Sequence, residues 1–465
     1  MNRDAIEAAL VDLLGREAVR AGEAVAAMDP GWHPDNLGAG LVVLPASTAE
    51  VARLLSWCST HKVAVVPHGG RTGLVGGGVS RPGEIVLSLQ RMAAIERLDV
   101  DGGIAIVEAG VTLASLQHAA AAVGLDPGID TAARDSATIG GMISTNAGGM
   151  RAFRNGVMRH RVLGIEAVLA DGTIMRDLGE VMKNTTGYDV KQLFIGTEGT
   201  LGIVTRAALR LEPLPGPRAT ALIGLPDITS GVAVVDHFRR IDGASLHAAE
   251  VMSGGYATAS AIAHGLSPEA LHLGSPVHLI IELSAATQEA ARDALLAGLS
   301  DLGETIAIAD GVVAETLRQR NAIWLIREAS DAMARGLGFA LWEDISVPPA
   351  RIDAWLPGVR ARLAAIDPAL RLDFIGHLAD GNLHVVVVRD HAYDVAPIKA
   401  IEAALYDGLS ALGGAFAAEH GIGGDKVPAL NRFADEGKKR LIATLKQALD
   451  PEALLNPGKV VITRS

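Results

Sequence analysis

Short apolar runs, separated by turns and small helical stretches, make up the chain as far as about residue 211. The runs at residues 41–45 and 63–67 have the length and β-branched content of buried strands. Between them the pattern predicts a helix, with Ser47 or Thr48 as its N-cap and Glu50 behind the cap. Short strands and small helices thus alternate through this part of the chain.

A proline-rich stretch, EPLPGP at residues 212–217, interrupts this pattern and predicts a domain boundary. Beyond it, strand-length apolar runs alternate with long alanine-rich helices, which predicts a layer of helices on one side of a sheet. From residue 415 the chain is again rich in glycine. We therefore expect an N-terminal helical segment at 1–36, a first domain at 37–215, a second domain at 216–415 and a C-terminal segment at 416–465.

Composition narrows the functional classes. Of 465 residues, 49% are hydrophobic and 20% charged, which indicates a large buried core. The net charge of −12 lacks the basic footprint of a nucleic-acid-binding protein and repels anionic lipid surfaces. One cysteine, Cys58, excludes an intramolecular disulfide and an iron–sulfur cluster. With no apolar run of about 18 residues and no signal-peptide pattern, we expect a cytoplasmic protein without a transmembrane segment.

The glycines, 53 in all, are concentrated in four clusters, at residues 69–78, 140–149, 196–202 and 421–424. Glycine-rich backbone can approach a ligand closely, and consecutive amides can surround a phosphate. Tight turns are the alternative, and they explain one such cluster more readily than four. The motifs GxGxxG after a strand and GxxxxGK[ST] are absent, so neither a Rossmann fingerprint nor a P-loop is predicted.

The sequence GHLADGNLH predicts a β-hairpin, because Asp380-Gly381 stands between two apolar runs. A two-residue turn there would place His377 opposite His384, with Cβ atoms roughly 5 Å apart, and Val386 would continue the same face. Two neighbouring imidazoles suit a metal ion. A histidine pair without a metal is the alternative.

A second chemical motif, AEHGIGG, follows at residues 418–424. Glu419 could supply a third, oxygen ligand, and His420 is a candidate general base. Two histidines and one carboxylate, with coordination positions left open, form a usual catalytic metal shell. Taken alone, Glu419-His420 could equally be a surface dipeptide.

Together these motifs resemble a known family. VVPHGGRTGLVGGG, TIGGMISTNAGG, NTTGYDVKQLFIGTEGTLGIVT, GHLADGNLH, AEHGIGGDK and NPGKV occur in the order found in FAD-dependent D-2-hydroxyacid dehydrogenases, near the D-lactate and D-2-hydroxyglutarate dehydrogenases. This family belongs to the vanillyl-alcohol-oxidase, or PCMH-type, flavoproteins. The resemblance implies a two-lobed FAD-binding PCMH-type domain at 37–215, a ferredoxin-like α+β cap domain at 216–415, and a C-terminal segment that returns to the FAD-binding domain.

The resemblance also implies roles for individual residues. His377, His384 and Glu419 would be ligands of a divalent metal, usually zinc, with His420 as the active-site base and Arg327 gripping the substrate carboxylate. The residues implied to contact FAD are Pro67, His68, Gly69, Gly70, Arg71, Thr72, Gly73, Leu74, Ser136, Thr138, Ile139, Gly140, Gly141, Thr145, Asn146, Gly148, Gly149, Glu198, Gly199, Gly202, Ile203 and Asn456.

The substrate pocket departs from the hydroxyglutarate-specific relatives. They carry Thr or Ser four positions after the arginine, lysine fifteen after it, and asparagine two residues beyond the second metal histidine. Ungapped counting puts Asp331, Trp342 and Val386 at these places, which disfavours a second substrate carboxylate. We therefore expect a monocarboxylic D-2-hydroxy acid, lactate-like or with an apolar tail.

Several alternatives stay open. Within the family, these are D-2-hydroxyglutarate dehydrogenation and an oxidase that uses oxygen; outside it, a non-catalytic metal- or nucleotide-binding module. The electron acceptor would be a quinone, a cytochrome or an electron-transfer flavoprotein. The alanine-rich helices of the cap would serve either a homodimer or only their own sheet.

Overall fold

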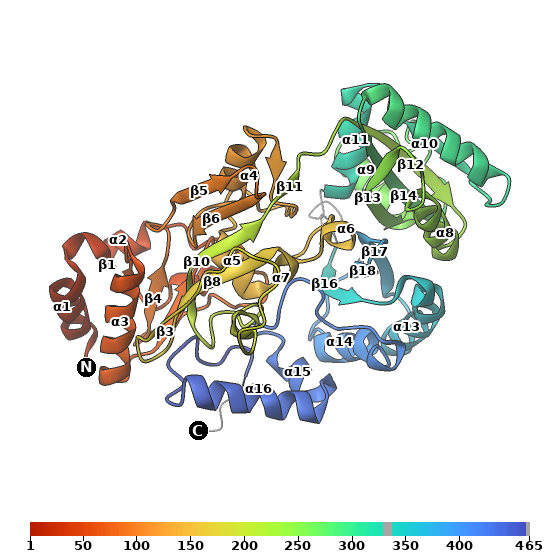
Figure 1. The fold of residues 1–465 in the computed structure, drawn as a ribbon. Helices are drawn as coiled ribbons and strands as arrows, with labels where there is room; N and C mark the ends of the chain where they lie inside the picture. The colour runs from red at the N-terminus through yellow and green to blue at the C-terminus, as the bar shows by residue number, and fades with distance from the viewer. Residues whose placement is uncertain (329–336, 462–465) are drawn as a thin grey trace. The chain divides into compact units, whose positions relative to one another are not determined.

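The computed structural model describes residues 1–328 and 337–461, and its contacts divide the chain into two compact units (Figure 1). The first unit comprises Met1–Gly149, Asn155–Leu214 and Glu419–Ser465; the second comprises Met150–Arg154 and Pro215–Ala418. A short stretch inside the expected first domain, residues 150–154, thus groups with the second unit. Among the described residues, no helix is both long enough and apolar enough to cross a membrane.

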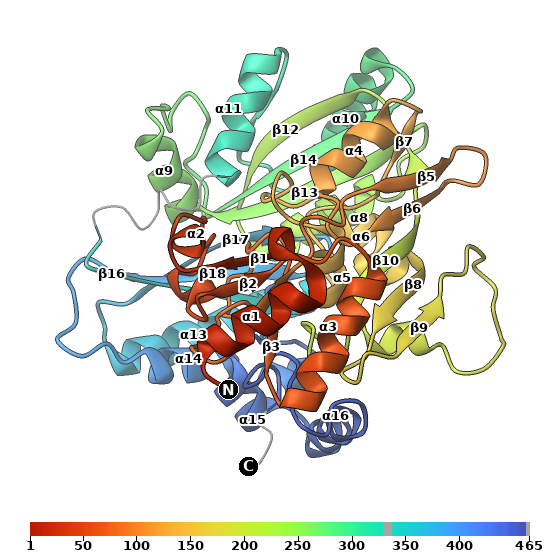
Figure 2. The ribbon, with the colours of Figure 1, turned by 90° about the vertical axis from the view of Figure 1, so that its left-hand side faces the viewer.

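The first lobe of the first unit is built on a four-stranded sheet of order β1-β2-β4-β3. Its strands are β1 (Val19–Ala21), β2 (Leu41–Val43), β3 (Val65–His68) and β4 (Ile85–Ser88). Helices α1 (Arg3–Leu14) and α3 (Thr48–His61) pack their apolar sides on this sheet (Figure 2). Ser47 is the N-cap of α3, accepting the N–H of Glu50, as the sequence predicts. The N-terminal 36 residues contain the strand β1 as well as a helix, so they are part of this sheet.

The second lobe is a five-stranded antiparallel sheet of order β5-β6-β10-β8-β9. Its strands are β5 (Ile95–Asp99), β6 (Ile104–Glu108), β8 (Val162–Val168), β9 (Ile174–Asp177) and β10 (Ile203–Arg210). Helices α4 (Leu113–Ala121) and α5 (Ile139–Thr145) share its apolar core. A separate two-stranded ribbon pairs β7 (Leu125–Asp126) with β11 (Glu212–Pro213).

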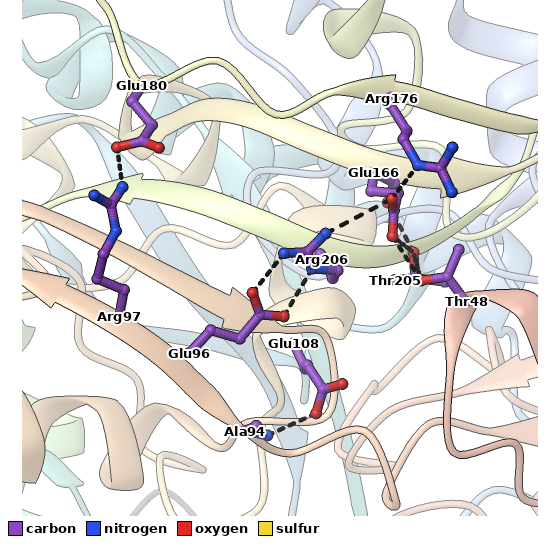
Figure 3. A network of polar contacts seen from close by, with 10 residues as sticks. All are labelled: Thr48, Ala94, Glu96, Arg97, Glu108, Glu166, Arg176, Glu180, Thr205 and Arg206. Carbon is purple, nitrogen blue, oxygen red and sulfur yellow. Dashed lines mark hydrogen bonds and ion pairs between the residues drawn. The ribbon is translucent and has the colours of Figure 1, made fainter.

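A buried carboxylate joins the two lobes (Figure 3). Glu166, on β8, is 3% exposed and accepts a hydrogen bond of 2.6 Å from the Thr48 hydroxyl at the start of α3. Its second oxygen accepts from Arg176 Nε at 2.8 Å, and Arg206 lies 3.7 Å away. Because Thr48 belongs to the first lobe and the arginines to the second, Glu166 fixes the first lobe to the second.

Replacing Glu166 with alanine is expected to destabilise the first unit by about 2 kcal/mol, because Thr48 loses its buried acceptor. This corresponds to a fall of roughly 4–8 °C in the thermal midpoint. Glu180→Ala is the control, since Glu180 pairs with Arg97 on the surface, where both side chains are exposed. Equal midpoints for the two variants in a calorimetric scan would contradict this role of Glu166.

The C-terminal segment belongs to the first unit. After α15 (Val427–Phe433) and α16 (Glu436–Leu449), Leu455 forms a parallel bridge with Val65 of β3. Lys446 is 3% exposed, and its ammonium donates to Asp450 and to the carbonyls of Thr200 and Leu455. Leu455 therefore lies against the first lobe's sheet.

The second unit contains one seven-stranded antiparallel sheet of order β15-β12-β14-β13-β17-β18-β16. Its strands are β12 (Arg218–Leu225), β13 (Ala244–Ser253), β14 (Val277–Ala285), β15 (Asp310–Val313), β16 (Phe339–Ser346), β17 (Arg371–His377) and β18 (Asn382–Arg389). With α8 (Ile228–Phe238) and α10 (Gln288–Gly303), β12–β15 form a ferredoxin-like βαββαβ motif. With α13 (Ile352–Ile366) and α14 (Ile398–Tyr406), β16–β18 repeat that motif without its last strand.

Helices cover both faces of this sheet, so the expectation of helices on one side only is wrong. Residues of α9 (Gly254–Ala263) and α11 (Leu317–Glu328) pack on one face, in a cluster with Ile375 and Val386. On the opposite face, a Cβ on Gly231 of α8 would lie 2.8 Å from Leu378 and 4.0 Å from Leu279, so this helix packs there. Alanine-rich helices show apolar character without showing which face of a sheet they will cover.

Candidate active site

The two histidines of the GHLADGNLH motif are neighbours, but through a different strand register from the predicted one. His377 pairs with Asn382, and Ile375 pairs with His384, so the connection is the four residues 378–381. The prediction of a two-residue turn at Asp380-Gly381 is therefore wrong. His377 and His384 are diagonal neighbours on one face, with ring centroids 5.5 Å apart and ring planes at 86°.

A buried glutamate lies beside the first of these histidines. Glu250, on β13, is fully buried and pairs with His377 across the strands. Its carboxylate oxygens lie 2.8 and 2.9 Å from His377 Nδ1, and one of them accepts from Arg327 Nε at 2.7 Å. Burial alone would raise the pKa of Glu250, but the adjacent His377 and Arg327 outweigh burial and lower the pKa to about 2. Glu250 is therefore an anion at neutral pH.

A second buried carboxylate lies beside the other histidine. Asp344, on β16, is fully buried, pairs with His384, and has an oxygen 3.4 Å from His384 Nδ1. It also accepts hydrogen bonds from the Asn382 amide at 2.8 Å and the Ala418 N–H at 3.0 Å. Ala418 immediately precedes the Glu419-His420 motif.

This arrangement fits a pair of metal-binding imidazoles. A carboxylate facing Nδ1 favours the tautomer with its proton on Nδ1, which leaves the lone pair of Nε2 for a metal ion. Of the other predicted residues, Glu419 and His420 belong to the first unit, where Glu419 Oε1 accepts the Gly149 N–H at 2.7 Å. Since the predicted ligands come from different units, the complete three-ligand set stays a prediction.

In the first unit, the first two glycine clusters pack directly on each other. A Cβ on Gly69 would lie 2.4 Å from Thr138 Oγ1, and one on Gly70 would lie 1.8 Å from the Ser136 carbonyl oxygen. Arg71, the next residue, has a φ of 56°. Close packing of this kind requires glycine and brings the backbones of two predicted FAD-binding motifs together.

Three of the predicted FAD-binding residues bear buried polar atoms that have no hydrogen-bond partner within the described residues. These atoms are His68 Nδ1, Arg71 Nε and Asn456 Oδ1. His68 Nε2 lies 2.7 Å from the Gly78 carbonyl, and burial together with Arg71 and Lys459 lowers the His68 pKa to about 4, so the ring is neutral at pH 7. Buried polar atoms normally have partners, and the polar groups of a bound nucleotide cofactor would provide them.

Glu198, which the sequence predicts as an FAD contact, hydrogen-bonds the protein's own backbone. Its carboxylate accepts the N–H groups of Ile422 and Gly423 at 2.7 and 2.8 Å, so the side chain binds the fourth glycine cluster. The Asn456 amide donates to the Glu198 carbonyl at 2.8 Å, which ties the C-terminal segment to the same loop. The remaining predicted FAD-binding residues all lie in the first unit: Pro67, Thr72, Gly73, Leu74, Ile139, Gly140, Gly141, Thr145, Asn146, Gly148, Gly149, Gly199, Gly202 and Ile203.

Two of the predicted substrate-pocket residues lie on the histidine face of the second unit's sheet. Trp342 pairs with Val386, and both belong to the apolar cluster that covers this face. The ring of Trp342 meets that of Tyr256 edge-on, with centroids 6.4 Å apart. Asp331 lies outside the described residues. Besides Arg327, the predicted pocket residues that the structure describes are Trp342 and Val386, and both lie in an apolar cluster.

Sequence reasoning missed Glu250 and Asp344. Both are acidic residues within strand-length runs, AAEVM and LWEDIS. Each lies on the face of its strand that points into the core. A carboxylate at an inward position must be paired, because an isolated buried charge costs too much free energy. That signal predicts a buried partner without naming it.

Comparison with known proteins gives two family matches along the chain. Residues 39–177 match the family described as "FAD binding domain", and residues 214–460 match "FAD linked oxidases, C-terminal domain". The chain is 33% identical over 424 residues to the D-2-hydroxyglutarate dehydrogenase of Stutzerimonas stutzeri, covering 90% of each chain. It is 33% identical to the mitochondrial D-2-hydroxyglutarate dehydrogenase of Bos taurus, over 93% of this chain and 79% of that protein.

Solved structures show the same fold at lower identity. Substrate-bound p-cresol methylhydroxylase superposes with a TM-score of 0.71 at 19% identity, covering 98% of this chain and 96% of its own. Alkyldihydroxyacetonephosphate synthase gives 0.65 at 16% identity, over 90% of this chain and 76% of its own. The chain therefore belongs to the FAD-linked oxidase family, with the α+β fold of PCMH-type flavoproteins. It is an FAD-linked oxidoreductase, and its first unit holds the FAD-binding domain.

Proposed function

We propose that this protein oxidises a D-2-hydroxy acid to the corresponding 2-oxo acid with the help of a divalent metal, zinc being the first candidate. The observation that supports this most strongly is the pair of neighbouring histidines whose Nδ1 atoms both face buried carboxylates. One of these carboxylates, Glu250, also joins His377 to Arg327. The names of the relatives, which act on D-2-hydroxy acids, support the same reaction class.

The proposed chemistry divides between cofactors and side chains. Bound FAD would accept the α-hydride, and a metal on His377, His384 and Glu419 would lower the pKa of the substrate hydroxyl. His420 takes the hydroxyl proton, since imidazole titrates near neutral pH. Arg327 binds the substrate carboxylate; because its Nε donates to Glu250, the carboxylate is held through the two Nη groups.

The apolar cluster that contains Trp342 and Val386 supports a proposed substrate preference. Trp342 and Val386 stand where hydroxyglutarate-specific relatives are expected to carry lysine and asparagine. A distal carboxylate desolvated against these two side chains would lack a partner. We therefore propose a monocarboxylic substrate such as D-lactate or a homologue with an apolar tail.

Steady-state kinetics test this preference with D-lactate, D-2-hydroxybutyrate and D-2-hydroxyglutarate, using an artificial electron acceptor. We expect kcat/KM for D-2-hydroxyglutarate to be at least about 10-fold below that for the best monocarboxylic acid, since one unpaired buried charge costs more than 1.4 kcal/mol. A Trp342→Lys variant should bring kcat/KM for D-2-hydroxyglutarate closer to that for the best monocarboxylic acid. A wild-type enzyme that prefers D-2-hydroxyglutarate would contradict the argument.

A second candidate, D-2-hydroxyglutarate dehydrogenation, is favoured by the names of the relatives. It keeps the same proton and hydride chemistry and requires a cation for the second carboxylate. The same kinetic comparison separates the two candidates. Oxygen consumption in the absence of an added acceptor would distinguish an oxidase from a dehydrogenase that passes electrons to a quinone, a cytochrome or an electron-transfer flavoprotein.

A further inference from the structure

The second unit has two buried carboxylates on adjacent strands, and both anchor the same helix. Glu250 on β13 binds Arg327 of α11 through Nε. Glu282 on β14 accepts hydrogen bonds from Trp324 Nε1 at 3.0 Å and Arg320 Nε at 3.0 Å. Residues 320, 324 and 327 are spaced three and four apart, so they share one side of α11.

Only the first of these carboxylates, among the described contacts, also reaches a histidine. Glu250 lies between Arg327 and His377, with all three side chains largely buried: 0%, 13% and 5% exposed. Glu282 is just as buried, and its remaining contacts are Thr220 and Arg218. Both carboxylates thus lie on neighbouring strands and bind the same helix, α11. They differ in that Glu250 also contacts a histidine.

We propose that Glu250 is a positioning residue that serves two binding groups at once, the metal-binding imidazole of His377 and the carboxylate-binding guanidinium of Arg327. This inference rests on the function proposed above. Both oxygens of Glu250 face His377 Nδ1 and so fix its tautomer, and one of them also accepts from Arg327 Nε and so fixes the guanidinium. In a 2-hydroxy acid the hydroxyl and the carboxylate are on adjacent carbons and lie close together. A single rigid side chain that holds both His377 and Arg327 therefore sets the distance between the groups that bind the hydroxyl and the carboxylate.

Glu250→Gln is the informative variant, because it keeps the shape and removes the charge. Its amide NH₂, when turned toward His377, favours the tautomer with the proton on Nε2, which opposes metal binding. We expect Zn²⁺ affinity to fall about 10–100-fold, with a rise in KM for the 2-hydroxy acid of about 10-fold or more. Glu282→Gln is the matched control and is expected to change neither quantity by more than about threefold.

The experiment uses the FAD-loaded full chain. Zn²⁺ affinity is measured on metal-depleted enzyme by competition with a chromophoric chelator, KM is measured on Zn²⁺-saturated enzyme, and the thermal midpoint is recorded for every variant. Glu250→Asp is included in case Glu250→Gln does not fold. The shorter aspartate side chain cannot reach His377 and Arg327 together. We therefore expect the same fall in Zn²⁺ affinity and the same rise in KM, both smaller in magnitude.

Each outcome decides the proposal. Loss of Zn²⁺ affinity together with a raised KM in the Glu250 variant, both near wild type in Glu282→Gln, would support it. An unchanged Glu250 variant, a change in only one quantity, or equal losses in both variants would overturn it while leaving the proposed function intact. Wild-type enzyme that binds no Zn²⁺ and gains no activity from it would instead overturn the metal-dependent function itself, and this inference with it.

Discussion

Replacing His420 with asparagine is expected to lower kcat for the 2-hydroxy acid about 10²–10⁴-fold, the usual contribution of a positioned general base. Asparagine can still hydrogen-bond the substrate hydroxyl, but it cannot accept the proton at neutral pH. KM should change little, because in the proposed function Arg327 and the metal bind the substrate. Rapid anaerobic mixing, with flavin absorbance as the signal, measures the reductive step directly.

The control for this variant is His61→Asn, which changes an exposed histidine that stacks on Trp57 in α3 of the first unit. Both variants should retain the flavin spectrum of the wild type, which shows that the FAD-binding domain is intact. If His420→Asn reduced its flavin as fast as His61→Asn does, another group would have to be the base.

Removing either of the two proposed metal-binding histidines is expected to lower kcat/KM nearly as much as removing both. His377→Ala and His384→Ala should each fail to bind one metal ion per chain. Each should also lower kcat/KM by about 10³-fold, because a metal acting as a Lewis acid stabilises the transition state by several kcal/mol. The double variant should be little worse than either single variant, because residues that act as one unit are not additive. Elemental analysis of the purified proteins gives the metal content.

His272→Ala is the matched control, because His272 also has a carboxylate neighbour, Asp310, at 2.6 Å, yet lies on the surface of the same unit. It should keep both its metal and its activity. Additive losses in the double variant, or full activity in a metal-free single variant, would show that the two histidines do not hold a catalytic metal.

Much of the fold could be predicted because local patterns coincide with the structure. The Ser47 cap and the positions of the first strands depend on neighbouring residues. The hairpin register could not be read reliably in the same way. Asp380-Gly381 has the composition of a two-residue turn, but Gly381 has a φ of 81° within a longer connection, where it packs on the Val347 carbonyl. The Gly381 N–H donates to the His377 carbonyl, so the connection closes over four residues and Gly376 pairs with Leu383.

The site shows the same limit. The motifs predicted that His377 and His384 would be neighbours, and they are, on the same face though not directly opposed. The sequence could not show that Glu250, more than 120 positions before His377, would bind that histidine and Arg327 together. Pairing between β13 and β17 brings Glu250 to His377, and such long-range pairing leaves no local signal in the sequence.

The most direct test of the whole account is the visible spectrum of the purified protein, recorded without oxygen before and after adding D-lactate, with L-lactate and D-2-hydroxyglutarate in parallel. We expect a flavin spectrum that is bleached by D-lactate and not by L-lactate, and only weakly by D-2-hydroxyglutarate. Bleaching by D-2-hydroxyglutarate alone would contradict the substrate preference while keeping the reaction. A flavin spectrum that none of the three acids, nor D-2-hydroxybutyrate, can bleach would contradict the proposal that this flavoprotein oxidises D-2-hydroxy acids.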